Sequence, residues 1–232
     1  PFYLDGRHQT IVRVDNWASN PYLALVNIDD YLLLSGLSIR SAGRWNEVKH
    51  RSDRLVHTNR IWNHRSQLAK IYKDVVSHND EHSPFAITKG KVTASYTKSG
   101  DGILRIGADE FKFPGQHDFG KYISGGWLEE FVFNQVHSLI GYGVCDVRIG
   151  ACVKWPDSNR DAQEFDVLAT DGRRLIIIEC KAGNVKAEDV YKLQQNVRAY
   201  GGVEAHGILA AAFPPPPYVQ ERLDRKSTRL NS

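Results

Sequence analysis

The sequence predicts an α/β protein with a smaller α+β segment, followed by a core in the order helix, three strands, helix and strand. Three observations support this fold class. Helical hydrophobic periodicity alternates with short apolar runs, and the turn dipeptide Asp171-Gly172 separates two of those runs. Glycine, proline and polar residues interrupt the periodic segments at 113–126. We therefore expect residues 1–112 to form the first segment and residues 113–213 the core.

In the first segment, local signals predict one strand, two helices and a small antiparallel sheet. Asn27 begins the short helical stretch NIDDYLLLSG and is a residue type that caps helix N-termini. Residues 59–76 carry apolar side chains at helical spacing and predict a longer helix. The strands are predicted at TIVRV, at KVTASYT and at GILRIGADEFKF, with a turn at 99–102. A winged-helix-like nucleic-acid binder within residues 38–113 is one candidate arrangement.

The elements of the core are easier to delimit. Residues 127–140 and 187–200 have helical periodicity, and Gly201-Gly202 is expected to end the second helix. The proline run 214–217 cannot continue a helix or a strand. The strands are predicted at VCDVRIGACV, EFDVLAT, RRLIIIECK and HGILAAAF, and the second and third form a hairpin.

Composition and charge exclude several classes of protein. The 41% hydrophobic and 25% charged residues are typical of a globular chain, and no apolar stretch is long enough for a membrane span. Three cysteines without a CxxC pair fit a reducing cytoplasm and argue against a structural zinc site. The formal charge of +3 is compatible with a polyanionic partner.

The two ends of the chain have unusual features. The sequence contains no methionine and begins at PFYLDG, so we expect it to be a fragment that lacks an N-terminal part. Residues 214–232 are expected to form a tail. Within this tail RKSTRLNS, residues 225–232, resembles translated adapter sequence and is expected to be non-native.

Charged residues follow directly after the apolar strand Leu175–Ile178. If Asp171 and Gly172 lie symmetrically at the hairpin tip, Asp166 is opposite Ile177 and Glu164 is opposite Glu179. Alternate residues of a strand share one face of a sheet. Glu164, Asp166, Ile177, Glu179 and Lys181 are therefore predicted on one face, with Asp166 and Glu179 as diagonal neighbours roughly 7 Å apart at the backbone.

Two carboxylates at this separation repel each other, and a shared cation removes the repulsion. Oxygen ligands from Asp166 and Glu179 suit Mg²⁺ or Mn²⁺, and the backbone carbonyl of Cys180 can supply another. Lys181 can orient or help to deprotonate an attacking water, or neutralise charge on a phosphate. Solvated charges at a hairpin end are the alternative interpretation, and an odd-length turn would place Asp166 on the opposite face.

The first core helix offers a further acid. Trp127, Leu128, Phe131, Val132, Val136 and Leu139 form its apolar face, with Trp127 expected in the core. Glu129 lies at the edge of that face, whereas Glu130 falls on the polar side. Glu129 either points toward the metal, directly or through water, or simply complements the helix dipole.

The motifs support a closer comparison. Glu129, Asp166 and the triplet Glu179-Cys180-Lys181 resemble the PD-(D/E)XK nuclease superfamily, whose core has the same element order. SGGWLEEFVFNQV, QEFDVLATDGRRLIIIECKAG and VYKLQQNVRAYGG resemble the C-terminal nuclease domain of CRISPR ancillary nucleases. In those proteins a CARF sensor domain precedes a restriction-endonuclease-like domain. The resemblance covers about residues 86–212.

The resemblance implies a metal-dependent endonuclease that cuts single-stranded RNA or DNA with Mg²⁺ or Mn²⁺. It implies a homodimer in type III CRISPR antiviral defence, activated by cyclic tetra-adenylate through a sensor domain that we expect to be missing here. By position, Asp166 and Glu179 would be the metal ligands, Lys181 the catalytic lysine and Glu129 the helix acid, with Glu130 as the alternative. A DNA restriction or repair endonuclease without messenger control, and a non-catalytic nucleic-acid-binding module, are the alternative functions.

Other charged and aromatic residues are candidates for contacts with nucleic acid. Lys192 and Arg198 on the second core helix are candidates for binding the substrate backbone. The basic residues between Arg40 and Lys73, with Trp45 and Trp62, could contact phosphates and stack bases, or simply face water. His78, Asp80, Glu81 and His82 are interpreted as a solvated loop and not as a metal site.

Overall fold

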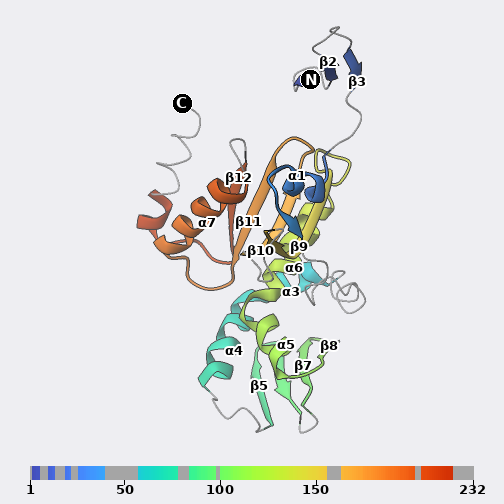
Figure 1. The fold of residues 1–232 in the computed structure, drawn as a ribbon. Helices are drawn as coiled ribbons and strands as arrows, with labels where there is room; N and C mark the ends of the chain where they lie inside the picture. The colour runs from blue at the N-terminus through green and yellow to red at the C-terminus, as the bar shows by residue number, and fades with distance from the viewer. Residues whose placement is uncertain are drawn as a thin grey trace.

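The protein contains three β-sheets, and the largest of them carries the residues of interest (Figure 1). Its five strands have the order β12-β11-β10-β9-β4, with antiparallel pairing except for the parallel pair β11–β12. These strands are β4 (Ser38–Ile39), β9 (Asp146–Lys154), β10 (Gln163–Thr170), β11 (Leu175–Lys181) and β12 (His206–Ala211). The computed structural model describes residues 2–5, 10–13, 19–21, 26–39, 57–77, 84–97, 100–155, 163–201 and 205–221.

Helices cover both faces of this sheet. Helix α6 (Trp127–His137) contacts β9, β10 and β11 on one face, where Val132 and Val136 pack against Val167. Helices α7 (Ala187–Tyr200) and α1 (Ile28–Leu34) lie on the other face (Figure 1). The mixed α/β class expected from the sequence is confirmed.

The hairpin β10–β11 differs in register from the sequence prediction. Leu168, and not Asp166, is opposite Ile177. The turn uses four residues because the side chain of Asp171 accepts the backbone N–H groups of Arg173 and Arg174, at 2.8 and 2.7 Å. This difference of two positions is even, which by itself would keep every side chain on its predicted face. However, Phe165 and Leu168 pack in the same core as Ile177, so the alternation of β10 is broken between them. Glu164 therefore lies on the face opposite Ile177, and its predicted face is wrong. The paired part of the ladder ends at Val167 with Ile178, so it does not include Asp166 or Glu179.

The second sheet is antiparallel and has four strands in the order β5-β6-β7-β8 (Figure 1). The sequence predicted β6, β7 and β8 but not β5. Helix α5 (Gln116–Lys121) packs on this sheet and leads through a π-helical turn, η2 (Tyr122–Gly126), directly into α6. The strands are β5 (Phe85–Lys89), β6 (Val92–Tyr96), β7 (Gly102–Ile106) and β8 (Asp109–Phe113).

The helix expected at 59–76 is two helices. Helix α3 (Thr58–Asn63) ends at His64, whose backbone N–H bonds to the carbonyl of Ile61, and α4 (Arg65–Ser77) follows at once. The interruption lets α3 pack against α6 while α4 packs against β5 and β6. Tertiary packing therefore overrides a continuous helical pattern.

The predicted short helix α1 is confirmed, and Asn27 caps it by accepting the N–H of Asp30 at 2.8 Å. Although α1 and β4 belong to the first segment in sequence, β4 joins the large sheet and α1 packs on it. Ile28 donates its backbone N–H to Asp146, and Arg148 pairs with both Asp146 and Asp29. Near the N-terminus, β1 (Phe2–Asp5), β2 (Thr10–Arg13) and β3 (Ser19–Pro21) form the third sheet.

The end of α6 also differs from the prediction. The helix stops at His137 and not at residue 140, and Leu139 is 49% exposed. None of the described helices is long and apolar enough to cross a membrane. Several candidates lie outside the described residues: the loop residues His78, Asp80, Glu81 and His82, the basic residues from Arg40 to Arg54 with Trp45, and the tail 225–232.

Candidate active site at the end of strand β11

Strand β11 has apolar side chains that pack in two cores, and its last residues include the charged Glu179 and Lys181. Leu175 and Ile177 pack on the α7 side of the sheet, and Ile178 packs on the α6 side. Strand alternation therefore directs Glu179 and Lys181 to the α7 side. Glu179 is only 4% exposed, so its side chain is largely buried near the C-terminal end of β11.

Asp166 is anchored to the same end of β11. Its carboxylate accepts the backbone N–H of Cys180 at 2.6 Å. The pKa of Asp166 is raised to about 6, chiefly by burial; the Cys180 hydrogen bond opposes this increase and the charge of Glu179 adds to it. The structure thus places the charge of Glu179 close enough to Asp166 to disfavour the ionisation of Asp166.

Two ammonium groups meet the carboxylate of Glu179. Its Oε1 atom lies 2.9 Å from Nζ of Lys181 and 3.7 Å from Nζ of Lys192, which projects from α7. Burial acts to lower the pKa of Lys181. The hydrogen bond and charge of Glu179, together with Asp189, outweigh it, so the pKa of Lys181 is raised above its usual value. Lys181 is therefore a cation at neutral pH.

The two acids of α6 have different surroundings. Burial raises the pKa of the Cys180 thiol well above its ordinary value, and the charges of Asp166 and Glu129 add to this effect. Glu129 therefore lies close to the end of β11. Glu130 was expected on the polar side but is fully buried, because α3 covers that stripe and Thr58 bonds to Asn134 there.

The side chains at the end of β11 limit which metal ion could bind there. Among the described residues, no group of three or more histidine, cysteine, aspartate or glutamate side chains is placed to hold an ion. Two carboxylates are nevertheless the set that Mg²⁺ commonly uses, because it keeps several water ligands and takes others from phosphate. Asp166 and Glu179 fit such an ion, whereas the structure does not make Glu129 part of a three-carboxylate ligand group.

Comparison with known proteins agrees with this geometry. Residues 117–219 match the family model described as the Card1-like endonuclease domain. This part of the chain resembles a Card1-like endonuclease domain. The match confirms the resemblance to the PD-(D/E)XK nuclease domain of CRISPR ancillary proteins and the restriction-endonuclease-like fold.

Solved structures share the fold over nearly the whole chain. Can2 from Sulfobacillus thermosulfidooxidans, in complex with cyclic tetra-adenylate, is 18% identical with a TM-score of 0.59, covering 97% of this chain and 63% of that one. Protein VC1899 from Vibrio cholerae is 17% identical with the same TM-score of 0.59, covering 97% of this chain and 62% of that one. The chain thus spans less than two thirds of either protein. A comparison with curated proteins finds no match.

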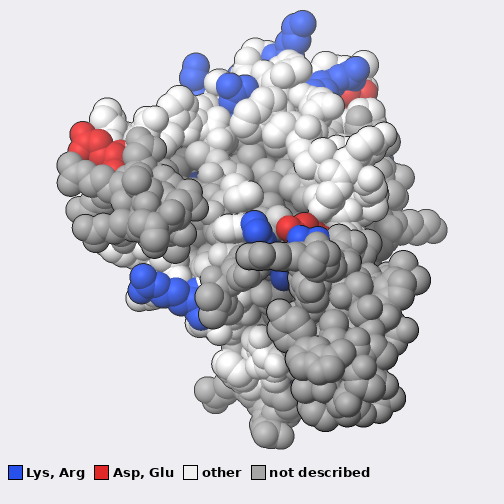
Figure 2. All heavy atoms as spheres, turned by 90° about the horizontal axis from the view of Figure 1, so that it is seen from above, with Lys and Arg blue, Asp and Glu red and all other residues white. Residues whose placement is uncertain are grey.

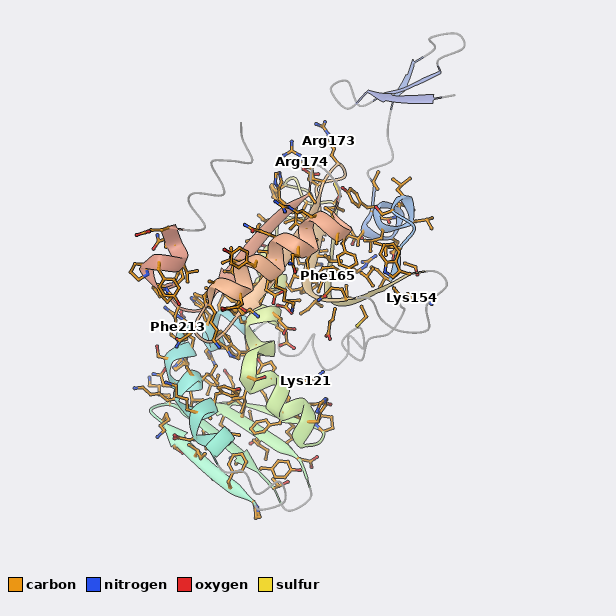
Figure 3. The ribbon with its side chains drawn as sticks, turned by 60° about the vertical axis from the view of Figure 1, so that its left-hand side comes forward. Lys121, Lys154, Phe165, Arg173, Arg174 and Phe213 are labelled. Carbon is orange, nitrogen blue, oxygen red and sulfur yellow. The ribbon has the colours of Figure 1, made fainter. Side chains whose placement is uncertain are left out.

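Of the two candidates for substrate binding, only Lys192 lies at the charged cluster. Lys192 approaches Glu179, whereas Arg198 is exposed in the last turn of α7, about 9 Å further along the helix axis. Figure 3 shows Arg173 and Arg174 at the far turn of the β10–β11 hairpin, away from this cluster.

Two described arginines of the basic run, Arg60 and Arg65, have partners within the protein, whereas Lys70 and Lys73 are exposed. Trp62 stacks on Phe131 with ring centroids 4.5 Å apart, and the guanidinium of Arg65 lies 4.6 Å from the Trp62 ring. Arg60 pairs with Asp109. The stacking of Trp62 on a nucleic-acid base is therefore not supported. From above, described lysine and arginine side chains lie apart from one another and form no single basic patch (Figure 2).

Sequence reasoning missed Asp189, which lies 3.3 Å from Nζ of Lys181. The available signal was an acid in the first turn of a helix, which predicts a cap. Its contact with Lys181 is set by how α7 packs on β11 and has no local sequence signature. Asp189 and Lys192 thus add two charged residues to those of the motif at this end of the sheet.

Proposed function

We propose that the chain is a metal-dependent endonuclease that hydrolyses phosphodiester bonds in nucleic acid. The observation that carries this proposal is the meeting of Asp166, Glu179 and Lys181 at one end of β11, within the residues that match the Card1-like endonuclease domain. Such a cluster combines a pair of anionic oxygen ligands with a fixed cation. Phosphodiester hydrolysis needs both, because charge grows on the phosphate as water attacks.

Asp166 and Glu179 are the proposed ligands of Mg²⁺ or Mn²⁺, with the backbone carbonyl of Cys180 as an additional oxygen. When bound, the ion supplies an activated water and charge neutralisation. The Cys180 N–H holds one oxygen of Asp166 and thereby sets the direction of the carboxylate. Glu129, near Cys180, is the proposed helix acid and acts through water.

Lys181 is proposed to act on the phosphate as a cation. Its raised pKa makes it a poor proton acceptor at neutral pH, so its positive charge and N–H groups are the useful features. A protonated lysine beside Glu179 can donate to a phosphate oxygen and stabilise the charge that develops there. Stabilisation of charge on the phosphate is therefore favoured over deprotonation of the water as the role of Lys181.

We propose single-stranded RNA or DNA as substrate and type III CRISPR antiviral defence in the cytoplasm as the setting. The Card1-like match and the similarity to Can2, which binds cyclic tetra-adenylate, support this proposal. Activation by cyclic tetra-adenylate would require a sensor domain in a longer protein, and a homodimer is the proposed assembly. The division at residue 113 into a linking segment and a nuclease core likewise remains a proposal.

The decisive experiment compares wild-type protein with Glu179→Gln on labelled single-stranded RNA and DNA in Mn²⁺. Glu179→Gln should reduce cleavage at least 100-fold while leaving binding of the strands in place. Glu164→Gln is the matched control, because Glu164 is an exposed acid of the same hairpin. Its activity should remain within twofold of wild type.

The other outcomes point to other functions. If folded wild-type protein binds both strands but cleaves neither in Mn²⁺ or Mg²⁺, the chain is a binding module and the enzymatic proposal is wrong. Cleavage restricted to duplex DNA would instead identify a restriction or repair endonuclease with the same site.

A further inference from the structure

The ammonium group of Lys181 is held by two carboxylates from different elements. Its Nζ atom lies 2.9 Å from Oε1 of Glu179 in its own strand and 3.3 Å from Oδ1 of Asp189 in α7. We propose that Asp189 is a positioning residue that fixes Lys181 for the reaction. This inference rests on the proposed function and adds a residue from outside the strand motif.

Asp189 is itself firmly anchored. Its second oxygen, Oδ2, accepts the backbone N–H of Lys186 at 2.8 Å, and its own N–H donates to the carbonyl of Lys186 at 3.2 Å. The carboxylate lies in the first turn of a 14-residue helix, where the macrodipole stabilises negative charge. Val185 and Val190, which flank this turn, are 2% and 3% exposed. The start of α7 therefore cannot shift without disrupting a core.

The two oxygens of Asp189 have separate partners. One oxygen caps the helix, and the other is directed to Lys181. A cap needs only one acceptor, so the second contact is not explained by helix formation. It links the position of Lys181 to the rigid start of α7.

This link matters because lysine is a long and flexible residue. A lysine side chain has about 2 kcal/mol of rotamer entropy, and its ammonium has three donors. With Glu179 and Asp189 each taking one donor, the third has a defined direction. Glu179 alone would restrain the Lys181 ammonium group poorly. Its Oε1 atom also approaches Lys192, and Glu179 is a proposed metal ligand. A displacement of about 1 Å at a reacting centre can cost 100-fold in rate.

The test separates helix capping from positioning. Asp189→Asn keeps an oxygen that can accept the Lys186 N–H but removes the charge facing Lys181. We expect its kcat to fall 10- to 100-fold with KM for the strand unchanged and the urea midpoint preserved. Glu188→Gln removes a neighbouring acid of the same turn, and its kcat should match wild type. Asp189→Glu, which restores the charge, should recover part of the loss.

Double-mutant analysis adds a second readout. If Asp189 acts through Lys181, adding Asp189→Asn to a Lys181→Gln variant should cause no further loss of residual activity. Additive losses would overturn the proposal. A fall in kcat of Asp189→Asn matched by Glu188→Gln would also overturn it, because both variants weaken the helix start alike.

The restraint can also be measured without any cleavage. The ¹⁵N relaxation order parameter of the Lys181 ammonium should be high in wild type and in Glu188→Gln. In Asp189→Asn it should drop toward that of Lys112, whose side chain is 74% exposed. An unchanged order parameter overturns the positioning role. Failure of wild-type protein to cleave overturns the proposed function instead, so the two failures are distinguishable.

Discussion

The carboxylate of Asp166 accepts the backbone N–H of Cys180 at 2.6 Å, one step beyond the last regular pair of the β10–β11 ladder, Val167 with Ile178. A side chain of β10 thus accepts a backbone N–H group of β11 at this point. The strands remain joined, and Asp166 is brought beside Glu179 and Lys181, whose charges act on it. This hydrogen bond therefore fixes the Asp166 carboxylate at the end of β11, where the other charged residues lie.

The first prediction concerns the stability cost of Asp166. Its pKa is raised from 3.8 to about 6 in the folded protein. A folded-state pKa above the unfolded value means that protonation stabilises the fold below pH 3.8 and that this contribution is lost as pH rises through 6. Asp166→Asn, which cannot ionise, should therefore gain stability relative to wild type at pH 8, by about 2 kcal/mol more than at pH 4.

Urea unfolding in the presence of a chelator, at both pH values, measures this difference. Glu164→Gln serves as control because its carboxylate is exposed. If the stability of Asp166→Asn relative to wild type does not increase from pH 4 to pH 8 without metal, ionisation of Asp166 does not destabilise the fold and this prediction is wrong.

The second prediction is competition between protons and metal. Because the pKa of Asp166 is about 6 without metal, protonation should weaken Mn²⁺ binding below this value. We expect the apparent affinity to be constant above about pH 7 and to fall up to tenfold per pH unit below 6. Calorimetric titration at pH 5, 6, 7 and 8 measures it. A pH-independent affinity in wild type would argue that Asp166 is not a ligand.

The third prediction separates Lys192 from Arg198. Lys192 approaches Glu179, so Lys192→Gln should raise KM for single-stranded substrate 3- to 10-fold and reduce the dependence of binding on salt by about one counterion. Arg198→Gln, at the far end of α7, should have a smaller effect. Filter binding over a salt series tests both. Equal effects would show that charge at any position on α7 suffices.

The fourth prediction tests the smaller sheet that supports α5 and α6. A Cβ atom at Gly102 would lie 2.2 Å from the ring of Phe119, which is 1% exposed. Gly102→Ala should therefore destabilise the protein by about 1–3 kcal/mol through overpacking. Gly120, within α5, has nothing within 4 Å of such an atom. Gly120→Ala should be neutral or stabilising, and thermal unfolding of both variants makes the comparison.

Local signals predicted much of the fold because they depend on near neighbours in the chain. The bounds of α7, Ala187–Tyr200, agree with the prediction, and Asn27 caps α1 as expected. The core strands lie within a few residues of their predicted positions. Helical and strand periodicity report which face of an element is apolar, and capping residues act within a single turn.

Distant packing decided the features that the sequence could not reveal. The break at His64 follows from α3 and α4 packing on different partners. Glu130 is buried because α3 covers a stripe of α6 that looks polar by itself. β4 joins the large sheet by pairing with β9, more than 100 positions away in the chain. No local pattern encodes such contacts.

The sequence by itself determined which residue types stand at the end of β11, and the alternation of a strand placed Glu179 and Lys181 on one face. The tertiary structure alone decided how far apart the charges lie and what surrounds them. It buried Glu179, raised the pKa of Asp166 and brought Asp189 to Lys181. The physical reason is that burial and charge–charge distances depend on elements meeting in space, whereas periodicity depends only on the chain itself.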